Sequence, residues 1–337
     1  MARPIAGPQS LLRTLNGRAI LETLARRGPL TRAELMAETG LSRTAVTQVL
    51  RMLESAGAVA HAGLDRETRG PAASKVALNP RLGVAAAVHV HPRGAHVVLV
   101  DAEGEVRAEN HAELPAHADR VEHIARLIDD GLRGAGAPLR TVVVGVPGIV
   151  TADGGIRDDQ GPDGGAFRSA LSMRLGCPVR VENDVNLAAV AELTSGVGAG
   201  LSSFALFLLD GGLGGGIVID GALHRGFSGV AGEITYLPQT PLPLAAPVLN
   251  DTVVSDLALA NGRDVDAPID VHLDAAAAGD EAALAMADEM GRRVAIAAGS
   301  VALVLDPEAF ILGGKAAHTC SSTPSPASPR STTSSCR

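Results

Sequence analysis

Three strongly hydrated polar residues, Glu182, Asn183 and Asp184, are adjacent in the stretch "PVRVENDVNLAAVAE". The letters before them, "PVRV", are typical of a buried strand, and "NLAAVAE" is typical of a helix. Two explanations are open for the polar joint. Asn and Asp cap helix N-termini, and a carboxylate suits the positive end of the helix dipole. The joint could equally hold a ligand, since ligands of open α/β sheets bind outside the carboxyl ends of the strands.

A glycine-rich run, "DGGLGGGIVIDGALHRG", is the second place where chemistry could occur. It lacks both the GxGxxG spacing and the lysine of a phosphate-binding loop. Close backbone packing at a hairpin bend is the plainer explanation for its glycines. The same stretch predicts a β-hairpin with Asp220 and Gly221 at its tip.

Alternating strands and helices surround these two stretches. "RLGVAAAVHVHPRGAHVVLVDAEGEV" predicts two strands with a turn at Glu103 and Gly104, and "VEHIARLIDDGLRGAG" predicts an amphipathic helix. "TVVVGVPGIV" and "SFALFLL" are further apolar strands. This alternation predicts a layered α/β body.

The first 78 residues have a different pattern. "TRAELMAETG" predicts a helix, because Thr31 and Glu34 form a capping box and Gly40 ends it. "LSRTAVTQVLRMLESAG" predicts a second helix with Ser42 as its cap. Two short helices around a glycine-containing turn are typical of a helix-turn-helix, and the two strands expected after Gly57 would form a wing.

Several polar side chains of this region suit DNA. Arginine can bond guanine and glutamine can bond adenine in the major groove, whereas hydroxyls suit phosphates. The candidates on the second helix are Ser42, Arg43, Thr44, Thr47 and Gln48, and those in the wing are Arg66, Arg69 and Lys75. The alternative is a three-helix packing module with a solvated polar face.

Composition agrees with a two-part chain. The net charge is −8 over 337 residues, but residues 1–80 carry a net +5, which favours a nucleic-acid module at the front. Hydrophobic residues make up 46% and aromatic residues 2%, so the core must consist of Ala, Val and Leu. "MARPIAGPQS" lacks the apolar stretch of a signal peptide, no run reaches transmembrane length, and the three cysteines are widely spaced. We therefore expect a cytoplasmic protein.

Six motifs in a fixed order resemble the transcriptional regulators of the ROK family (repressors, open reading frames and sugar kinases). They are "GPLTRAELMAETGLSRTAVTQVLRMLESAGAV", "RGPAASKVALNP", "VVGVPGIV", "VENDVNLAAVAE", "LGGGIVIDGALHRGFSGVAGEI" and "LDPEAFILGGK". The resemblance implies an α/β fold in which an N-terminal winged helix-turn-helix precedes a two-lobed, actin-like sugar-kinase body of the ribonuclease H-like class. The domains expected are 1–78 for DNA binding, 79–317 for the body, and 318–337 as a disordered Ser/Thr/Pro-rich tail.

The resemblance also implies a sugar site. In the family's kinases the residue at the position of Asp184 is the general base, and those at Asn183 and Glu233 hold sugar hydroxyls. Gly148 of "VVGVPGIV" joins this expected set. Asp163, in "RDDQGPDGGAF", stands where the family usually has an Asn.

Two departures from the family argue against kinase chemistry. The phosphate turn Asp-x-Gly-Gly-Thr-Lys is replaced by "HVHPRG", and the loop Gly-Thr-Gly-x-Gly-Gly-Gly by "DGGLGGG". Proline has no N–H to offer a phosphate, and the carboxylate of Asp210 would repel one. We therefore expect no ATP, and Asp184 as a sugar contact without catalysis.

We also expect no zinc. The family's zinc-binding His is replaced by Tyr236, and the segment after it has no Cys, so soft ligands are missing. His89 and His91 point to the same side of a strand, but such pairs are more often packed or solvated.

After "FILGGKAA" the sequence changes to "HTCSSTPSPASPRSTTSSCR", where the family usually continues with a helix, a strand and a closing helix. A reading-frame change and a true disordered tail are both open explanations.

The function expected is a DNA-binding transcriptional regulator, a repressor by the family's habit, that responds to a sugar. It would bind a palindromic operator as a homodimer or a dimer of dimers, one recognition helix per half-site. Two alternatives stay open: a ROK sugar kinase that phosphorylates a hexose or N-acetylhexosamine with ATP, and a DNA-binding protein with an inert body.

Overall fold

The computed structural model describes eight stretches of the chain, whose ranges are 9–65, 73–91, 94–113, 119–158, 161–162, 165–210, 212–238 and 247–314. Packing divides the chain into two units. The first unit is Met1–Gly145 with Ala166–Val181, and the second unit is Val146–Gly165 with Glu182–Arg337. Each unit is described by itself.

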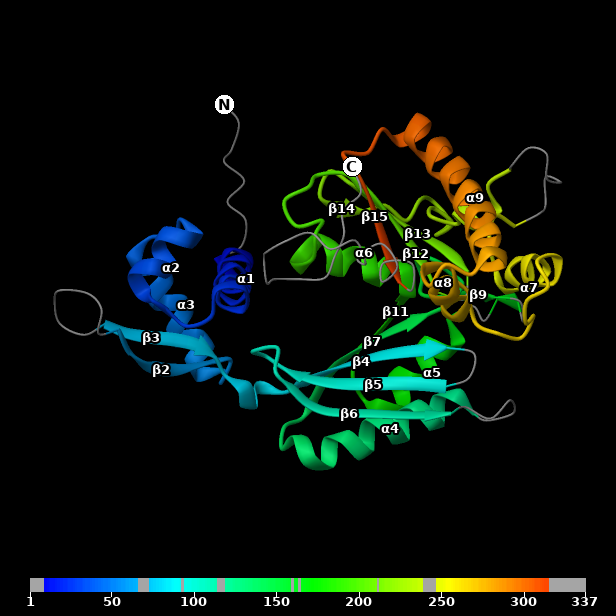
Figure 1. The fold of residues 1–337 in the computed structure, drawn as a ribbon. Helices are drawn as coiled ribbons and strands as arrows, with labels where there is room; N and C mark the ends of the chain where they lie inside the picture. Colours follow the sequence, from blue (N-terminus) through cyan, green and yellow to red (C-terminus); the bar gives the residue numbers. More distant parts are fainter. Residues whose placement is uncertain are drawn as a thin grey trace. The chain divides into compact units, whose positions relative to one another are not determined.

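The front of the first unit is a winged helix-turn-helix (Figure 1). Its helices are α1 (Gln9–Arg27), α2 (Arg32–Thr39) and α3 (Arg43–Ser55). Its strands are β1 (Leu30–Thr31), β2 (Val59–Asp65) and β3 (Ala73–Leu78), paired antiparallel in the order β1-β3-β2. The two helices and two wing strands predicted from the sequence are therefore present.

The capping box predicted for α2 is also present. The Glu34 N–H donates to the Thr31 hydroxyl at 3.3 Å, and the Thr31 N–H donates to the Glu34 carboxylate at 2.7 Å. Gly40 ends the helix with φ +68°, in the left-handed region that favours glycine. Beneath these ends, Ile20, Leu35 and Leu50 are fully buried in one apolar core.

A mixed sheet forms the rest of the first unit. Its strands are β4 (Val84–His91), β5 (Gly94–Asp101), β6 (Val106–Glu113), β7 (Leu139–Val146) and β11 (Val179–Asn183), in the order β11-β7-β4-β5-β6. Helix α4 (Arg120–Ala135) packs on β5 and β6, and α5 (Ala166–Leu175) packs on α4 (Figure 1). The two strands predicted within residues 81–106 are β4 and β5, and the turn predicted at Glu103 and Gly104 is present. It leads into β6, a third strand that the sequence analysis did not predict.

The short 3₁₀ helix η1 (Pro80–Leu82) links the winged helix to this sheet. Asn79 holds the link, since its side-chain amide donates to the Gly57 carbonyl at 2.8 Å. The Arg140 guanidinium donates to the Leu82 carbonyl at 2.7 Å. The predicted boundary at residue 78 thus falls at the end of β3, although packing places both sides of it in the first unit.

The second unit has a central sheet between two helical layers. The sheet contains β12 (Phe204–Leu209), β13 (Leu213–Ile219), β14 (Ala222–Leu223) and β15 (Ala309–Gly314), in the order β14-β13-β12-β15. Helix α6 (Asp184–Ser195) covers one face. The other face packs on the cluster that contains α7 (Asp251–Ala260), α8 (Ile269–Ala277) and α9 (Glu281–Leu305). A small sheet, β8 (Ile149–Val150), β9 (Ile156–Asp158) and β10 (Gly161–Pro162), completes the described strands.

Alternation along β12 explains this layering. Phe204 and Leu206 point to the α6 side, and Ala205 and Phe207 point to the α7–α9 side. The ring of Phe207 meets that of Phe310 edge to face, with centroids 5.5 Å apart. A strand buried on both faces is the continuous apolar run that the sequence contains.

The hairpin predicted at the end of β13 is confirmed. Asp220 and Gly221 both have positive φ, +52° and +69°, which a two-residue turn of type I′ requires. No helix among the described residues is both long and apolar enough to cross a membrane.

Loss of the capping box should loosen α2 locally. We expect Thr31→Ala to destabilise the helix by about 1 kcal/mol and to speed amide exchange over residues 32–39 about fivefold. Thr44→Ala, the same change at an exposed helical position, should leave this exchange unchanged. Equal exchange rates in the two variants would contradict the capping role.

Candidate functional site: polar residues around the start of helix α6 and a candidate nucleic-acid interface

Asn183 is the helix cap that the sequence allowed. Its side-chain oxygen accepts from the Asn186 N–H at 2.9 Å, at the first turn of α6. Its side-chain amide donates to the Gly148 carbonyl at 3.0 Å. Asn183 therefore caps the helix and also holds Gly148, a residue that was expected to belong to the sugar site. The φ of Gly148 is +99°.

Asp184 begins α6 and is half-buried. One carboxylate oxygen accepts from the Val185 N–H at 2.8 Å. A carboxylate held there can accept hydrogen bonds from hydroxyl groups, and charged bonds of this kind are stronger than neutral ones.

Glu182 lies behind this joint and is only 5% exposed. One of its oxygens accepts from the Asn183 N–H at 3.1 Å and from the Asn186 side-chain amide at 3.0 Å. The other accepts from the Arg225 guanidinium at 2.7 and 2.6 Å. A buried carboxylate needs such partners, and these fix the backbone from which Asn183 and Asp184 project.

The sequence analysis missed Glu182, Asn186 and Arg225 as a network. A usable signal was present: Arg225 is the sole Lys or Arg between Val181 and Gly262, beside a motif that is rich in carboxylates. Pairing across 43 residues is not visible in any local pattern, however.

Glu233 differs from Glu182 because its carboxylate has no hydrogen-bond partner among the described residues. It is half-buried and precedes the 3₁₀ helix η2 (Ile234–Tyr236), which it does not cap through its side chain. Burial raises the pKa of the Glu233 carboxyl, and the charge of nearby Asp184 raises it further. Glu233 therefore lies within electrostatic reach of Asp184, and its carboxylate can accept hydrogen bonds from the hydroxyl groups of a ligand.

The glycines of β13 bring these carboxylates together. A Cβ on Gly214 or Gly216 would lie 2.4 Å from the Val185 side chain or 2.6 Å from Ala189, both on α6. On the opposite face, a Cβ on Gly215 would lie 2.6 Å from the Gly232 carbonyl. The glycines therefore have the packing role that the sequence favoured.

The described members of the expected sugar set, Gly148, Asn183, Asp184 and Glu233, all belong to the second unit. Hydrogen bonds join Asn183 to Gly148, and charge coupling joins Asp184 to Glu233. Asp163 lies outside the described residues, so its expected contact stays a prediction.

The altered phosphate loops are described in part. His89 and His91 lie at the end of β4 with ring centroids 6.0 Å apart, whereas Pro92 and Arg93 fall outside the described residues. Asp210 is exposed at the end of β12. Among the described residues no three His, Cys, Asp or Glu side chains gather as metal ligands would. The expectations of no ATP and no zinc stay predictions.

The described members of the predicted DNA-binding set lie at the N-cap of α3, on α3 and on β3. Ser42 caps α3, with its hydroxyl accepting from the Ala45 N–H at 3.3 Å. Arg43, Thr44 and Gln48 are exposed and Thr47 is half-buried. Lys75 is half-buried on β3, opposite Thr31 on β1. Arg66 and Arg69 lie outside the described residues.

Family comparison agrees with both halves of this architecture. A winged helix-turn-helix DNA-binding family matches residues 13–60, and the ROK family matches residues 87–322. The chain therefore belongs to the ROK family, and its front carries a winged helix-turn-helix.

Curated relatives include the xylose repressor of Caldicellulosiruptor bescii, 25% identical over 240 residues, and the DNA-binding transcriptional dual regulator NagC of Escherichia coli, 27% identical over 246 residues. These matches cover 68% and 70% of this chain. Each covers 60% of the relative, so the chain spans about three fifths of the relatives' length.

Solved structures show the same fold. A ROK family transcriptional regulator, a homologue of the E. coli MLC protein, superposes with a TM-score of 0.76 at 21% identity, covering 90% of this chain and 84% of that one. A ROK glucokinase from Streptomyces griseus, in complex with glucose and AMPPNP, superposes at 0.56 with 26% identity, covering 70% of this chain and 85% of the kinase. The fold is thus shared by regulators and kinases.

Glu233 should make stability depend on pH. Because its pKa is raised in the folded protein, its ionisation destabilises the fold above that pKa, and the cost disappears as the pH falls toward the value of about 4.3 for a free Glu. We expect Glu233→Gln to raise the melting temperature at pH 7 and to give a smaller gain near pH 4.5. A gain independent of pH would contradict this assignment.

Gly232 should tolerate no side chain. Its φ is +97°, and a Cβ would lie 2.2 Å from the Gly215 carbonyl oxygen. Gly221→Ala is a matched control, since Gly221 has φ +69° with nothing within 4 Å, and should cost only the roughly 1–2 kcal/mol of the left-handed conformation. We expect Gly232→Ala to lower the melting temperature clearly more than Gly221→Ala. Equal losses would show that the close approach is not essential.

Proposed function

We propose that this chain is a transcriptional repressor whose affinity for DNA is set by a sugar bound in the second unit. The observation that carries the proposal is the pairing of two features in one chain. A winged helix-turn-helix presents an exposed polar helix, and a ROK body keeps an unsatisfied, half-buried Glu233 beside Asp184.

The effector is a polyhydroxylated sugar. Asp184 and Glu233 accept hydrogen bonds from its hydroxyls, and Asn183 offers its side-chain amide. Gly148 is held beside Asn183 by the hydrogen bond between them. Arg225 is committed to Glu182 and supports these groups instead of binding the sugar. The first sugars to test are xylose and glucose, which are named for the xylose repressor and for the glucokinase complex, and N-acetylglucosamine, because the N-acetylglucosamine repressor of Escherichia coli O6:H1 is a further relative.

DNA binding uses two winged helices on a palindromic operator, which requires a homodimer or a dimer of dimers. Sugar shifts the protein toward the conformation that binds sugar better, and repression is relieved if that conformation binds DNA less well. The protein acts in the cytoplasm and needs neither zinc nor ATP.

A sugar kinase is the second candidate, favoured by the likeness to the glucokinase and by Asp184 at the position of the kinase base. The replaced phosphate loops oppose it, because "HVHPRG" and "DGGLGGG" lose the donors that phosphates need. Release of ADP from ATP in the presence of xylose, glucose or N-acetylglucosamine would establish the kinase and contradict the repressor without catalysis.

Substitutions should affect the sugar response and DNA binding separately. We expect Glu233→Gln and Asp184→Asn to abolish the sugar response and to leave DNA affinity intact, and Gln48→Ala to weaken specific DNA binding without changing sugar affinity. Fluorescence anisotropy with duplexes from the chain's own upstream region, and thermal shift with the sugar panel, measure the two properties. Loss of DNA binding in a well-folded Asp184→Asn variant would contradict this division.

A further inference from the structure

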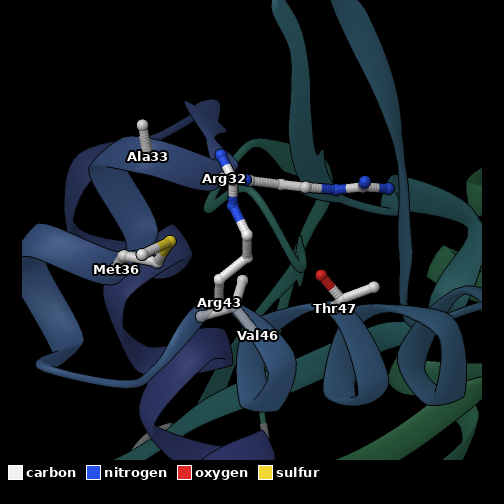
Figure 2. A pocket seen from close by; sticks show the side chains of 6 residues that line it. All are labelled: Arg32, Ala33, Met36, Arg43, Val46 and Thr47. Atoms are coloured by element: carbon white, nitrogen blue, oxygen red, sulfur yellow. The ribbon is translucent and has the colours of Figure 1, made fainter.

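A surface cavity of about 430 Å³ lies between α2 and α3 (Figure 2). Its lining residues are Arg32, Ala33 and Met36 from α2, and Arg43, Val46 and Thr47 from α3. The polar part of this lining consists of two guanidinium groups and one hydroxyl. Figure 2 shows the Arg43 side chain rising from α3 toward the start of α2, where Arg32 begins.

Both arginines lack an acidic partner within the described part of the chain, and both are exposed. Arg18 and Arg27 of the winged helix have acidic partners, Glu22 at 2.6 Å and Glu38 at 3.1 Å, whereas Arg26 and Arg51 have no ion pair with a described residue. Arg32 and Arg43 differ from Arg26 and Arg51 because they line one cavity together. Positive charge is therefore left uncompensated at this cavity. The positive end of the α3 dipole adds to it, because Arg43 is the first residue of that helix.

The polar residues of α3 fall on two stripes. Arg43 and Thr47 are four residues apart, so they share one side of the helix, and that side lines the cavity. Thr44 and Gln48 form a second stripe, about 100° further round the helix, and neither lines the cavity. The two stripes thus face different surroundings.

We propose that Arg32, Arg43 and Thr47 form a clamp for one backbone phosphate of DNA, which leaves base reading to Thr44 and Gln48. The inference rests on the proposed DNA-binding function. It changes the role expected for Arg43 from the sequence, where it was a candidate guanine contact, and it adds Arg32, which the sequence analysis did not assign.

The chemistry of the cavity fits a phosphate. Arginine offers a planar fork of N–H donors that matches phosphate oxygens, and a threonine hydroxyl can donate to the same group. A phosphate is present at every step of the duplex, so a clamp of this kind sets the position of α3 without selecting a sequence. The stripe formed by Thr44 and Gln48 is then held against the edges of the bases.

The test uses the full chain and two duplexes. One is enriched by the wild-type chain from a randomised 20-base-pair library, and the other is a shuffled duplex of equal composition. We expect Arg32→Ala and Arg43→Ala each to weaken both duplexes by the same factor and to leave the enriched consensus unchanged. The double variant should flatten the slope of log K against log salt by about 1, the release expected for one phosphate.

Matched variants separate the roles. Arg18→Ala removes one charge from the same region and should leave the slope unchanged, and Gln48→Ala should weaken the enriched duplex alone. Arg32→Lys and Arg43→Lys keep the charge and should recover most of the slope, which guards against a folding defect in the alanine variants.

Two results would overturn the clamp. If Arg43→Ala weakens only the enriched duplex, or enriches a different consensus, Arg43 reads a base, and the proposed DNA-binding function still stands. If the wild-type chain enriches no sequence and binds no shuffled duplex at low salt, both the clamp and the proposed function are wrong.

Discussion

The second unit depends on a close approach of three backbones at strand β13. Gly214 and Gly216 let α6 press on one face of the strand, and Gly215 lets the segment at Gly232 press on the other. Side chains at any of these positions would occupy the space that now belongs to Val185, Ala189 or a carbonyl oxygen. Because α6 begins with Asp184 and Gly232 precedes Glu233, this packing also determines how near the two carboxylates lie. The glycines of β13 thus act as spacers between the elements that carry the two acidic groups.

Three carboxylates of the second unit, those of Glu182, Asp184 and Glu233, have different environments and therefore different roles. Glu182 is buried but satisfied by Arg225 and by two amide donors, so it stabilises the joint and has little left to offer a ligand. Asp184 is held at the N-terminus of α6, where one of its oxygens accepts from the Val185 N–H. Glu233 is the unsatisfied member, and its raised pKa reflects the free energy that burial beside Asp184 costs. Hydroxyl donors from a sugar would give the Glu233 carboxylate hydrogen-bond partners that no described residue supplies.

Much of this arrangement could be read from the sequence because its signals are local. The capping box at Thr31, the turn at Asp220 and Gly221, and the helix start at Asn183 each involve neighbours within four residues. Strand β6 could not be read in this way, because "VRAENHAE" is a polar edge strand that only pairing with β5 defines. The bond between Glu182 and Arg225 joins residues 43 positions apart, and the cavity that unites Arg32 with Arg43 depends on how α2 packs on α3. Local patterns located the candidate segments, and tertiary packing determines which of their side chains lie together.

The course of the chain connects the two functions. It passes between the units at Gly145–Val146, Gly165–Ala166 and Val181–Glu182, and the winged helix belongs to the first unit. Gly148, Glu182 and Asn183 therefore stand within three residues of a crossing, on two different passages of the chain. The hydrogen bond from Asn183 to Gly148 ties these two passages together, and the bond from Glu182 to Arg225 anchors one of them to the segment before Glu233. A sugar held by Asn183 and Glu233 would thus act on residues that are covalently next to the unit that carries the DNA-binding helix.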